Sequence, residues 1–245
     1  MGEPKSIGLY EIEKVLGEGG MGKVYRAVHQ VTGRRVALKL SKANPYLLGR
    51  IDPRFVQEAD LLQKLRGCDN ILGYFEHGEI GGVAFIAMEL LQGESLREHL
   101  QARGGKLPEA EALEIMRQTC VGVAYAHDRR VLHRDLKPEN LFVTTNVPGN
   151  LLVKVIDFGL AKREIGVNDG MTMLGASMGT PGYMAPEQEK DARSADERAD
   201  VFGLGCVAFE LLTGKDLYPR GCSLTEAQPY FPKPGNVRQD VWSAI

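Results

Sequence analysis

The sequence has little cysteine, no long apolar run and no excess of charge of either sign. Its four cysteines lie far apart without a C-x-x-C pair, which argues against a zinc site or disulfide framework and fits a reducing compartment. The longest apolar run, Val201 to Leu212, contains Glu210 and is too short to span a bilayer. A formal net charge of −2 provides no general basic surface for nucleic acid or an anionic membrane. We therefore expect no nucleic-acid partner and no membrane segment within the chain, and a cytoplasmic location, either alone or as the cytosolic part of a longer anchored protein.

The length of 245 residues suits one large domain or two lobes, and a hydrophobic content of 43% is ordinary for a globular protein. Residues 1–9 are expected to form a disordered leader. Residues 10–91 are predicted to be rich in strands, because β-branched and small residues stand there in short runs between glycines. Residues 92–245 are predicted to be mostly helical. The pattern indicates a small β-rich lobe and a larger α-helical lobe.

Apolar periodicity and turn residues locate the main elements within these lobes. One helix is expected in the β-rich part, where apolar residues recur at spacings of three and four: Phe55, Ala59, Leu62 and Leu65. The clearest later helices cover 110–127 and 199–212, the second ended by Thr213-Gly214. Residues 171–186 are rich in Gly, Ser, Thr and Met, which predicts a long loop.

A glycine-rich segment near the N-terminus can be compared with three phosphate-binding templates. It reads Gly17-Glu18-Gly19-Gly20-Met21-Gly22 and is followed by Lys23-Val24. A dinucleotide motif should open a helix, whereas residues 24–28 continue as a strand, and no acidic residue follows at the required distance. A Walker A loop would need a Ser or Thr hydroxyl where Val24 stands. The third template, G-x-G-x-x-G-x-V, fits fully and is that of a lid in which glycines let backbone N–H groups approach phosphate oxygens. Taken alone, the segment fits an ordinary glycine-rich hairpin nearly as well.

A lysine and a glutamate that could form an ion pair follow the glycine-rich segment. Lys39 ends the apolar run Val36-Ala37-Leu38, where burial beside an anion is the usual reason for a lysine. Glu58 lies on the predicted helix that follows and is the natural counter-ion. The alternative for each residue taken singly is an ordinary surface position.

Three further motifs complete the pattern. They are His133-Arg134-Asp135-Leu136-Lys137-Pro138-Glu139-Asn140, Asp157-Phe158-Gly159 and Ala185-Pro186-Glu187. Their order and distances match the protein-kinase signature. The chain resembles a Hanks-type protein kinase, and Gly17 to Tyr25 resembles the bacterial eukaryotic-like Ser/Thr branch.

The resemblance implies an α+β, bilobal protein-kinase fold, with a β-rich N-lobe over 10–91 and an α-helical C-lobe over 92–245. In this family the glutamate at Glu187 pairs with an arginine on a late helix, beyond several more helices. Because the chain ends soon after Glu187, the resemblance leads us to expect a C-lobe that is incomplete at its C-terminus.

The resemblance also implies the chemistry, which is transfer of the γ-phosphate of ATP, with Mg²⁺, to Ser and Thr hydroxyls of protein substrates and of the chain itself. Asp135 would orient or deprotonate the hydroxyl, and Lys137 would hold the γ-phosphate and mark Ser/Thr specificity. Lys39, supported by Glu58, would hold the α- and β-phosphates. Oxygen ligands suited to Mg²⁺, a hard cation, would come from Asn140 and Asp157.

Further positions take roles from the same resemblance. The adenine site would comprise Val24, Ala37, Met88, Glu89, Leu91 and Phe142, with Glu89 C=O and Leu91 N–H bonding the adenine edge. Buried structural roles fall to Asp200, as an anchor on the central helix, and to His133, stacked beneath Phe158.

Regulation is expected in the long loop. Thr172 is the expected activating phosphorylation site, and Ser177 is the second candidate. Arg134 and Lys162 would bind that phosphate, and Thr180 would help to dock the substrate.

Two other function classes compete with an active kinase. A kinase-shaped scaffold would be favoured by loss of the lysine, the catalytic aspartate or the metal-binding aspartate, yet all three are present. A small-molecule phosphotransferase is disfavoured by Ala185-Pro186-Glu187 and the long loop, which serve a docked polypeptide. The expected partners are therefore protein substrates, and a second copy of the chain for phosphorylation in trans.

Overall fold

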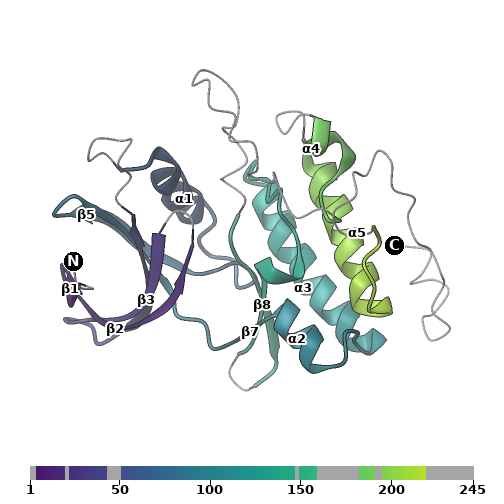
Figure 1. Ribbon diagram of the computed structural model, residues 1–245, viewed down its shortest axis with the longest axis horizontal. Coiled ribbons are helices and arrows are strands. Elements are labelled where there is room, and N and C mark those ends of the chain that lie inside the picture. Colours follow the sequence, from purple (N-terminus) through teal and green to yellow (C-terminus); the bar gives the residue numbers. More distant parts are fainter. Residues whose placement is uncertain are drawn as a thin grey trace. The chain divides into compact units, whose positions relative to one another are not determined.

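The computed structural model describes residues 4–19, 22–42, 51–146, 149–158, 182–190 and 195–218. The chain divides between Gln92 and Gly93 into two compact units. Strands dominate the first unit and helices the second, as the residue patterns predict (Figure 1).

The first unit is built on a curved antiparallel sheet with the strand order β1-β2-β3-β4-β6-β5. Its strands are β1 (Ser6–Ile7), β2 (Tyr10–Glu18), β3 (Gly22–His29), β4 (Arg35–Ser41), β5 (Tyr74–Ile80) and β6 (Val83–Glu89). Helix α1 (Pro53–Lys64) follows β4. It begins where the Asp52 carboxylate accepts a hydrogen bond of 2.9 Å from the Arg54 N–H, and Pro53 suits its first turn.

Successive side chains of a strand point to opposite faces of the sheet, so the core of this unit has two parts, one on each face. On one face Val36, Leu38 and Leu40 of β4 pack with Tyr25 and other buried residues. On the other face α1 contributes Phe55, Ala59 and Leu62, three of the four apolar residues that the spacing of three and four predicts; the fourth, Leu65, is the buried C-cap residue. The first three pack against side chains of β5 and β6, and the cluster comprises Phe55, Ala59, Leu62, Tyr74, Ala84, Ile86 and Met88.

Within the expected leader over residues 1–9, the described part contains strand β1, whereas residues 1–3 lie outside the described residues. Ser6 pairs with Glu11 and Ile7 with Tyr10 across a short turn. Ile7 is buried in the sheet core, so the segment gains apolar burial as well as backbone hydrogen bonds. A run of only two paired residues offers no periodicity in the sequence, which explains why the strand was not predicted.

The second unit combines a small antiparallel sheet with several helices. Its strands are β7 (Gly93–Ser95), β8 (Leu141–Thr145) and β9 (Leu151–Val155), in that spatial order. Its helices are α2 (Leu96–Ala102), α3 (Glu109–His127), the 3₁₀ turn η2 (Pro138–Asn140), α4 (Pro186–Lys190) and α5 (Glu197–Thr213). Gly214 ends α5 in the left-handed conformation at φ 72°, as its place after Thr213 predicts.

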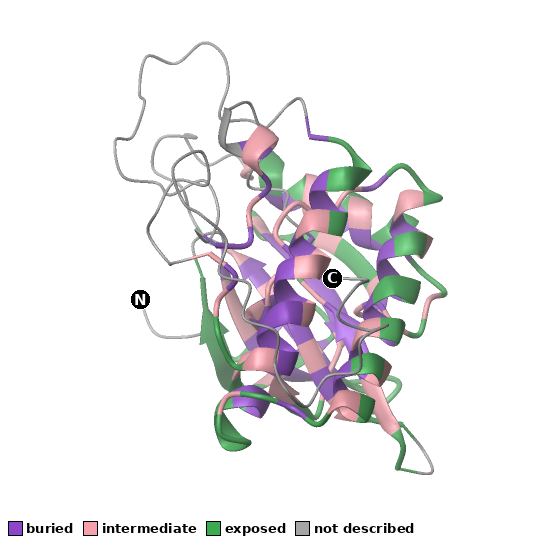
Figure 2. Ribbon diagram, turned by 90° about the vertical axis from the view of Figure 1, so that its right-hand side faces the viewer, coloured by how far each residue is buried: buried purple, intermediate pink, exposed green. Residues whose placement is uncertain are grey.

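Helix α3 holds the second unit together by packing against both β9 and α5. The buried side chain of Gln118 clamps the backbone of β9. Its amide donates to Leu151 C=O at 3.0 Å, and its carbonyl accepts from Val153 N–H at 2.8 Å. Figure 2 shows buried and exposed positions on different sides of the long helices. The β8–β9 hairpin is thereby fixed against α3, which matters because candidate site residues lie at its open end.

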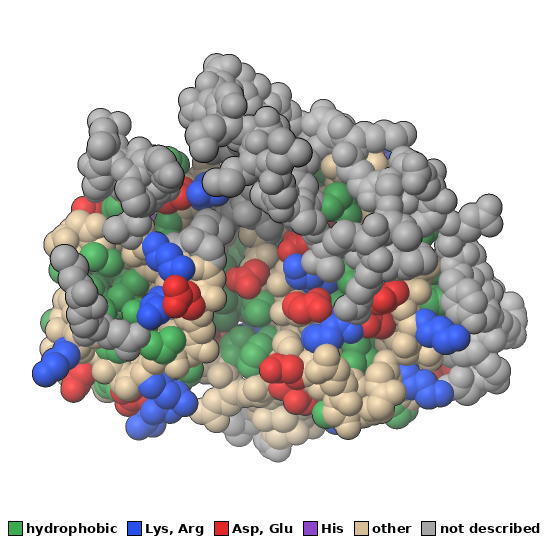
Figure 3. Space-filling view, in the orientation of Figure 1, with side chains coloured by type: hydrophobic (Ala, Val, Ile, Leu, Met, Phe, Trp, Pro, Cys, Tyr) green, Lys and Arg blue, Asp and Glu red, His purple; other side chains and the backbone are tan. Residues whose placement is uncertain are grey.

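On the face that Figure 3 shows, the described residues form no surface of one charge, and none of their helices is suited to a membrane. Acidic and basic side chains are interspersed over the visible faces of both units, in keeping with the small net charge (Figure 3). Among the helices within the described ranges, none is both long and apolar enough to cross a bilayer.

Candidate active site

The described residues of the glycine-rich segment lie at the end of β2 and the start of β3. Gly17 pairs with Val24 and Glu18 with Lys23, and Gly19 N–H donates to Gly22 C=O at 2.9 Å. The segment therefore leads into a strand, which contradicts the helix that a dinucleotide or Walker A motif requires. Gly20 and Met21 lie outside the described residues.

Two glycines of this hairpin differ in their surroundings. A Cβ on Gly22 would come 2.2 Å from Leu40 C=O of the neighbouring strand, whereas a Cβ on Gly17 would meet nothing within 4 Å. The packing of the protein itself thus requires glycine at residue 22 and not at residue 17. A requirement for glycine at residue 17 would come from something that approaches the backbone from outside, such as a phosphate.

This difference predicts opposite results for two alanine variants. Gly22→Ala should lose about 1–3 kcal/mol of unfolding free energy, because the β3–β4 pair must move apart. Gly17→Ala should unfold within about 0.5 kcal/mol of wild type. It should nevertheless bind Mg-ATP roughly tenfold more weakly, because its methyl group occupies the path of the phosphates. Urea unfolding and calorimetric nucleotide binding measure the two effects, and wild-type ATP affinity in Gly17→Ala would contradict the lid assignment.

Lys39 and Glu58 form a short, half-buried ion pair. Lys39 Nζ lies 2.6 Å from Oε1 and 2.7 Å from Oε2 of Glu58, and the two side chains are 14% and 12% exposed. Lys39 stands on β4 opposite Val24 of β3, and Glu58 projects from α1. The pair that the sequence predicts is therefore present, and it fixes an ammonium group on one face of the sheet.

Three of the residues expected to line an adenine site, Val24, Ala37 and Met88, share that face. Ala37 pairs with Met88 across β4 and β6, two positions from Lys39. Met88 is buried beneath α1, whereas Val24 and Ala37 are half-buried. The Glu89 carboxylate accepts from Gly73 N–H at 3.2 Å, so this side chain fixes the end of β6.

Two residues of the expected adenine site lie beyond the end of β6. Leu91 is half-buried and lies outside regular secondary structure. Phe142 belongs to the second unit, where it stands on β8 beside Gly93 of β7.

The second unit brings the expected catalytic residues together in one loop. Lys137 Nζ lies 3.0 Å from Oδ2 of Asp135. The Asn140 amide donates to the Asp135 carbonyl at 2.8 Å and to its carboxylate at 3.1 Å. The Asp135 carboxylate is thereby fixed between a cation and an amide.

The two candidate metal ligands flank the open end of the β8–β9 hairpin. Asn140 immediately precedes β8, Asp157 follows β9 by two residues, and Ile156 N–H donates to Asn140 C=O at 2.9 Å. Asp157 is exposed and has a φ of 53°. A positive φ in a non-glycine residue costs roughly 1–3 kcal/mol and is concentrated at functional sites. The amide and carboxylate oxygens of this pair are donors that suit a hard divalent cation.

A buried carboxylate fixes the start of the catalytic loop. Asp200 of α5 accepts hydrogen bonds from the N–H groups of His133 at 2.8 Å and Arg134 at 2.6 Å, and its Oδ2 lies 2.8 Å from His127 Nε2. Arg134, like Asp157, has a positive φ, of 64°. The anchor role expected of Asp200 is therefore supported by direct contacts, and the anchor holds a strained residue beside Asp135.

Comparison with known proteins agrees with this geometry. The family model described as "Protein kinase domain" matches residues 10–230. The chain belongs to the protein kinase family. This kinase domain is 37% identical to the probable serine/threonine-protein kinase PknB of Corynebacterium glutamicum, over 84% of the chain and 31% of the relative. It is 35% identical to the serine/threonine-protein kinase PrkC of Bacillus subtilis, over 85% of the chain and 31% of the relative. The predicted fold class and the bacterial Ser/Thr branch are confirmed, and the chain spans less than a third of either relative.

His133 links the catalytic loop to the residues after β9. Its Nε2 donates to Ile156 C=O at 3.0 Å, and its Nδ1 accepts from Asp135 N–H at 3.2 Å. Its ring lies 4.7 Å from that of Phe158, as the kinase resemblance implies. Burial lowers the pKa of His133 and outweighs the nearby carboxylates, of which Asp200 has the largest opposing effect. A lowered pKa, with one ring nitrogen donating and the other accepting, corresponds to a neutral imidazole at pH 7.

A neutral buried histidine predicts acid sensitivity of the kinase domain. The unfolded chain takes up a proton at His133 near pH 6.5, whereas the folded domain does so only at lower pH. The contribution of His133 to stability is therefore complete above about pH 6.5 and is lost as the pH falls toward the folded-state pKa, by up to about 1.4 kcal/mol per pH unit. His133→Phe should be less stable at pH 7.5 yet lose less stability between pH 7 and 5. Urea unfolding at several pH values tests this, and parallel slopes for the two proteins would contradict it.

Two residues support the site although the sequence analysis assigned them no role. The buried Gln188 of α4 donates to Arg134 C=O at 3.1 Å and accepts from Ala185 N–H at 3.2 Å. Gly203 of α5 packs against the catalytic loop, since a Cβ there would come 3.1 Å from the Cβ of Leu136. A lone glutamine and a glycine within a helix carry no recognisable motif.

Four of the regulatory predictions concern residues that lie outside the described part of the chain: Lys162, Thr172, Ser177 and Thr180. Arg134 is described, and its side chain donates to Ala195 C=O at 3.4 Å. The phosphate-binding role assigned to it remains a prediction.

Proposed function

We propose that this kinase domain transfers the γ-phosphate of Mg-ATP to Ser and Thr hydroxyls of protein substrates, including its own chain. The observation that carries the proposal is the catalytic loop, in which Lys137 Nζ lies 3.0 Å from Asp135 Oδ2 and Asn140 donates to the same carboxylate. A carboxylate held beside an ammonium group can orient a neutral hydroxyl near a polyanionic phosphate.

Each residue of the loop has a role in the proposed step. Asp135 accepts a hydrogen bond from the acceptor hydroxyl and takes its proton as the oxygen bonds to the γ-phosphorus. The bond from that phosphorus to the β,γ-bridging oxygen breaks, and ADP leaves. Lys137 stabilises the negative charge on the transferred group. The reaction is thus mainly a matter of positioning and charge stabilisation.

Several side chains and one hairpin are assigned to the nucleotide in this proposal. Lys39, oriented by Glu58, pairs with the α- and β-phosphates, and the β2–β3 hairpin covers them with backbone N–H groups. Asn140 and Asp157 hold Mg²⁺ through their side-chain oxygens. A divalent cation bound there supplies charge neutralisation to the phosphates.

Regulation by phosphorylation belongs to the same proposal. A phosphate on Thr172, or on Ser177 as the alternative, adds a charge of about −1.5 to −2 and three strong acceptors. Arg134 and Lys162 bind it and thereby align the loop that presents the substrate. Thr180 contributes to docking beside Asp135.

A radiolabel assay tests the proposed function directly. The purified chain is incubated with γ-labelled ATP, MgCl₂ and casein, and the labelled amino acids are separated after hydrolysis. Label on phosphoserine and phosphothreonine, both in casein and in the chain, is the expected result, with Lys39→Met as the inactive control. Binding of Mg-ATP without any transfer would instead identify a kinase-shaped scaffold, and label on tyrosine would contradict the Ser/Thr assignment.

A further inference from the structure

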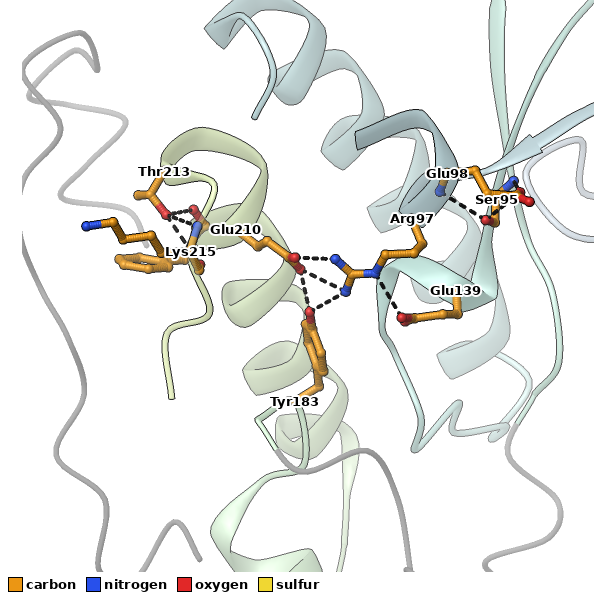
Figure 4. Close-up of polar contacts among 9 residues, drawn as sticks. Ser95, Arg97, Glu98, Glu139, Tyr183, Glu210, Thr213 and Lys215 are labelled. Carbon is orange, nitrogen blue, oxygen red and sulfur yellow. Dashed lines mark hydrogen bonds and ion pairs between the residues drawn. The ribbon is translucent and has the colours of Figure 1, made fainter. Parts of the chain in front are cut away.

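Arg97 lies at the centre of a polar cluster in the second unit, with Glu210 and Tyr183 buried and Glu139 at its more exposed edge (Figure 4). It is the second residue of α2, a short helix fixed by a capping box. In that box Glu98 N–H donates to Ser95 Oγ at 3.2 Å, and Ser95 N–H donates to the Glu98 carboxylate at 2.8 Å. Leu96 and Leu100 anchor the helix in the core. The cap and the apolar face together fix the direction in which Arg97 projects.

The guanidinium of Arg97 uses all three of its nitrogens. Its Nε donates to Glu139 Oε1 at 2.9 Å, and its Nη2 donates to the Tyr183 hydroxyl at 2.8 Å. Nη1 and Nη2 together contact the two carboxylate oxygens of Glu210 on α5, and the Tyr183 hydroxyl donates to Glu210 as well. One side chain thus joins residues that lie 42, 86 and 113 positions away along the chain.

The burial of the cluster makes its charges interdependent. Arg97 is 16% exposed and Glu210 only 7%. Burial opposes the charge of Arg97, but hydrogen bonds with Glu210 and Glu139 keep its pKa above the ordinary value. Burial and the hydrogen bond with Glu210 raise the pKa of Tyr183, so its hydroxyl remains a neutral donor. Removal of the guanidinium would take away the Arg97 cation that pairs with the buried Glu210 carboxylate, and loss of one member of a buried ion pair is strongly destabilising.

The cluster connects two segments with different roles in the proposed reaction. Glu139 lies in the catalytic loop, between Lys137 and Asn140. Tyr183 lies two residues before Ala185, where the motif that serves the docked polypeptide begins. The bridge through Gln188 joins Ala185 to Arg134 at the other end of the catalytic loop. The two segments are therefore joined near both ends of the loop.

We propose that Arg97 is a positioning residue that couples the catalytic loop to the Tyr183 segment and so controls phosphoryl transfer to protein substrates. The proposal rests on the proposed kinase function and deepens it. Arg97 contacts neither the Lys39–Glu58 pair nor Asp157 through any hydrogen bond described above. Its loss should therefore affect the use of the protein substrate while leaving nucleotide binding nearly unchanged.

The test compares Arg97→Lys and Arg97→Gln with Arg117→Gln. Arg117 is a suitable control because it also forms a two-nitrogen pair with a glutamate, Glu114, but on the exposed surface of α3. In Arg97→Gln we expect kcat/KM for a peptide substrate to fall at least tenfold and KM for ATP to change less than twofold. Arg97→Lys should recover only part of the activity, because an ammonium group cannot reproduce three directed nitrogens. Arg117→Gln should match wild type.

Amide hydrogen exchange provides a second test that does not depend on measuring kinase activity. Amide hydrogen exchange of the intact chain, at a temperature where Arg97→Lys remains folded, should increase together in residues 135–140 and 183–188. Parallel loss of ATP hydrolysis, peptide transfer and melting temperature would assign Arg97 a purely structural role and overturn the proposal, as would unchanged exchange in either segment. A wild-type chain that transfers no phosphate would refute the proposed kinase function instead, and the exchange data would still decide whether Arg97 couples the segments.

Discussion

Asp157→Ala should reduce the rate of phosphoryl transfer by about 10²–10³-fold, since the change removes a preorganised charge from the proposed metal site. Asp157 is exposed, so its loss creates no cavity. Alanine also cannot adopt a φ of 53° without strain, and local rearrangement could contribute to the loss. Asp157→Asn separates the two effects, because asparagine has the same size and tolerates that conformation while lacking the negative charge.

The measurements are kcat and KM for ATP over a range of MgCl₂ concentrations. Both variants should need more Mg²⁺ for half-maximal rate, and Asp157→Asn should remain as stable as wild type. Asp128→Asn is the matched control, because Asp128 is an exposed aspartate at the end of α3. Rates near wild type in Asp157→Asn, at every Mg²⁺ concentration, would remove Asp157 from the metal site.

Most of the fold was predictable because local patterns and tertiary packing agree. The apolar spacing in α1 matches the face that it buries, and Gly214 ends α5 where the sequence indicates. The short elements were not predictable. Strands β1 and β7 have two and three residues, and helix α2 has seven, so none repeats a periodicity often enough to detect.

The residues of the candidate site also divide into those that the sequence predicts and those that it does not. Asp135, Lys137 and Asn140 are close in sequence, and their contacts within one loop follow from that spacing. Arg97 gave no comparable signal, because an arginine early in a helix is ordinary, and its partners come from three other segments. Sequence motifs thus identified the residues assigned to the reaction, whereas the residues that hold them needed the tertiary structure.

Asp200 was predicted as an anchor and holds the catalytic loop through direct contacts. Of the substitutions proposed, its removal should lower the free energy of unfolding most. In Asp200→Ala the buried N–H groups of His133 and Arg134 lose their acceptor, and His127 loses its carboxylate. Loss of one partner from such a buried arrangement typically costs about 3–5 kcal/mol, a large part of the roughly 5–15 kcal/mol that stabilises a domain. Arg134, at a φ of 64°, should then relax and displace Asp135.

Asp196→Ala provides the matched control for Asp200→Ala on the same helix. Asp196 is the exposed N-cap of α5, where its carboxylate accepts from Arg198 N–H at 2.9 Å, and its loss should cost only about 1 kcal/mol. Asp200→Asn should fall between the two, because it keeps one acceptor oxygen for three donors. Urea unfolding gives the free energies, and the phosphotransfer rate of the folded fraction of Asp200→Asn reports the position of Asp135. If Asp200→Ala unfolds within 1 kcal/mol of Asp196→Ala, the catalytic loop does not depend on this anchor, since a loop held by Asp200 would have lost the acceptor of two adjacent backbone N–H groups.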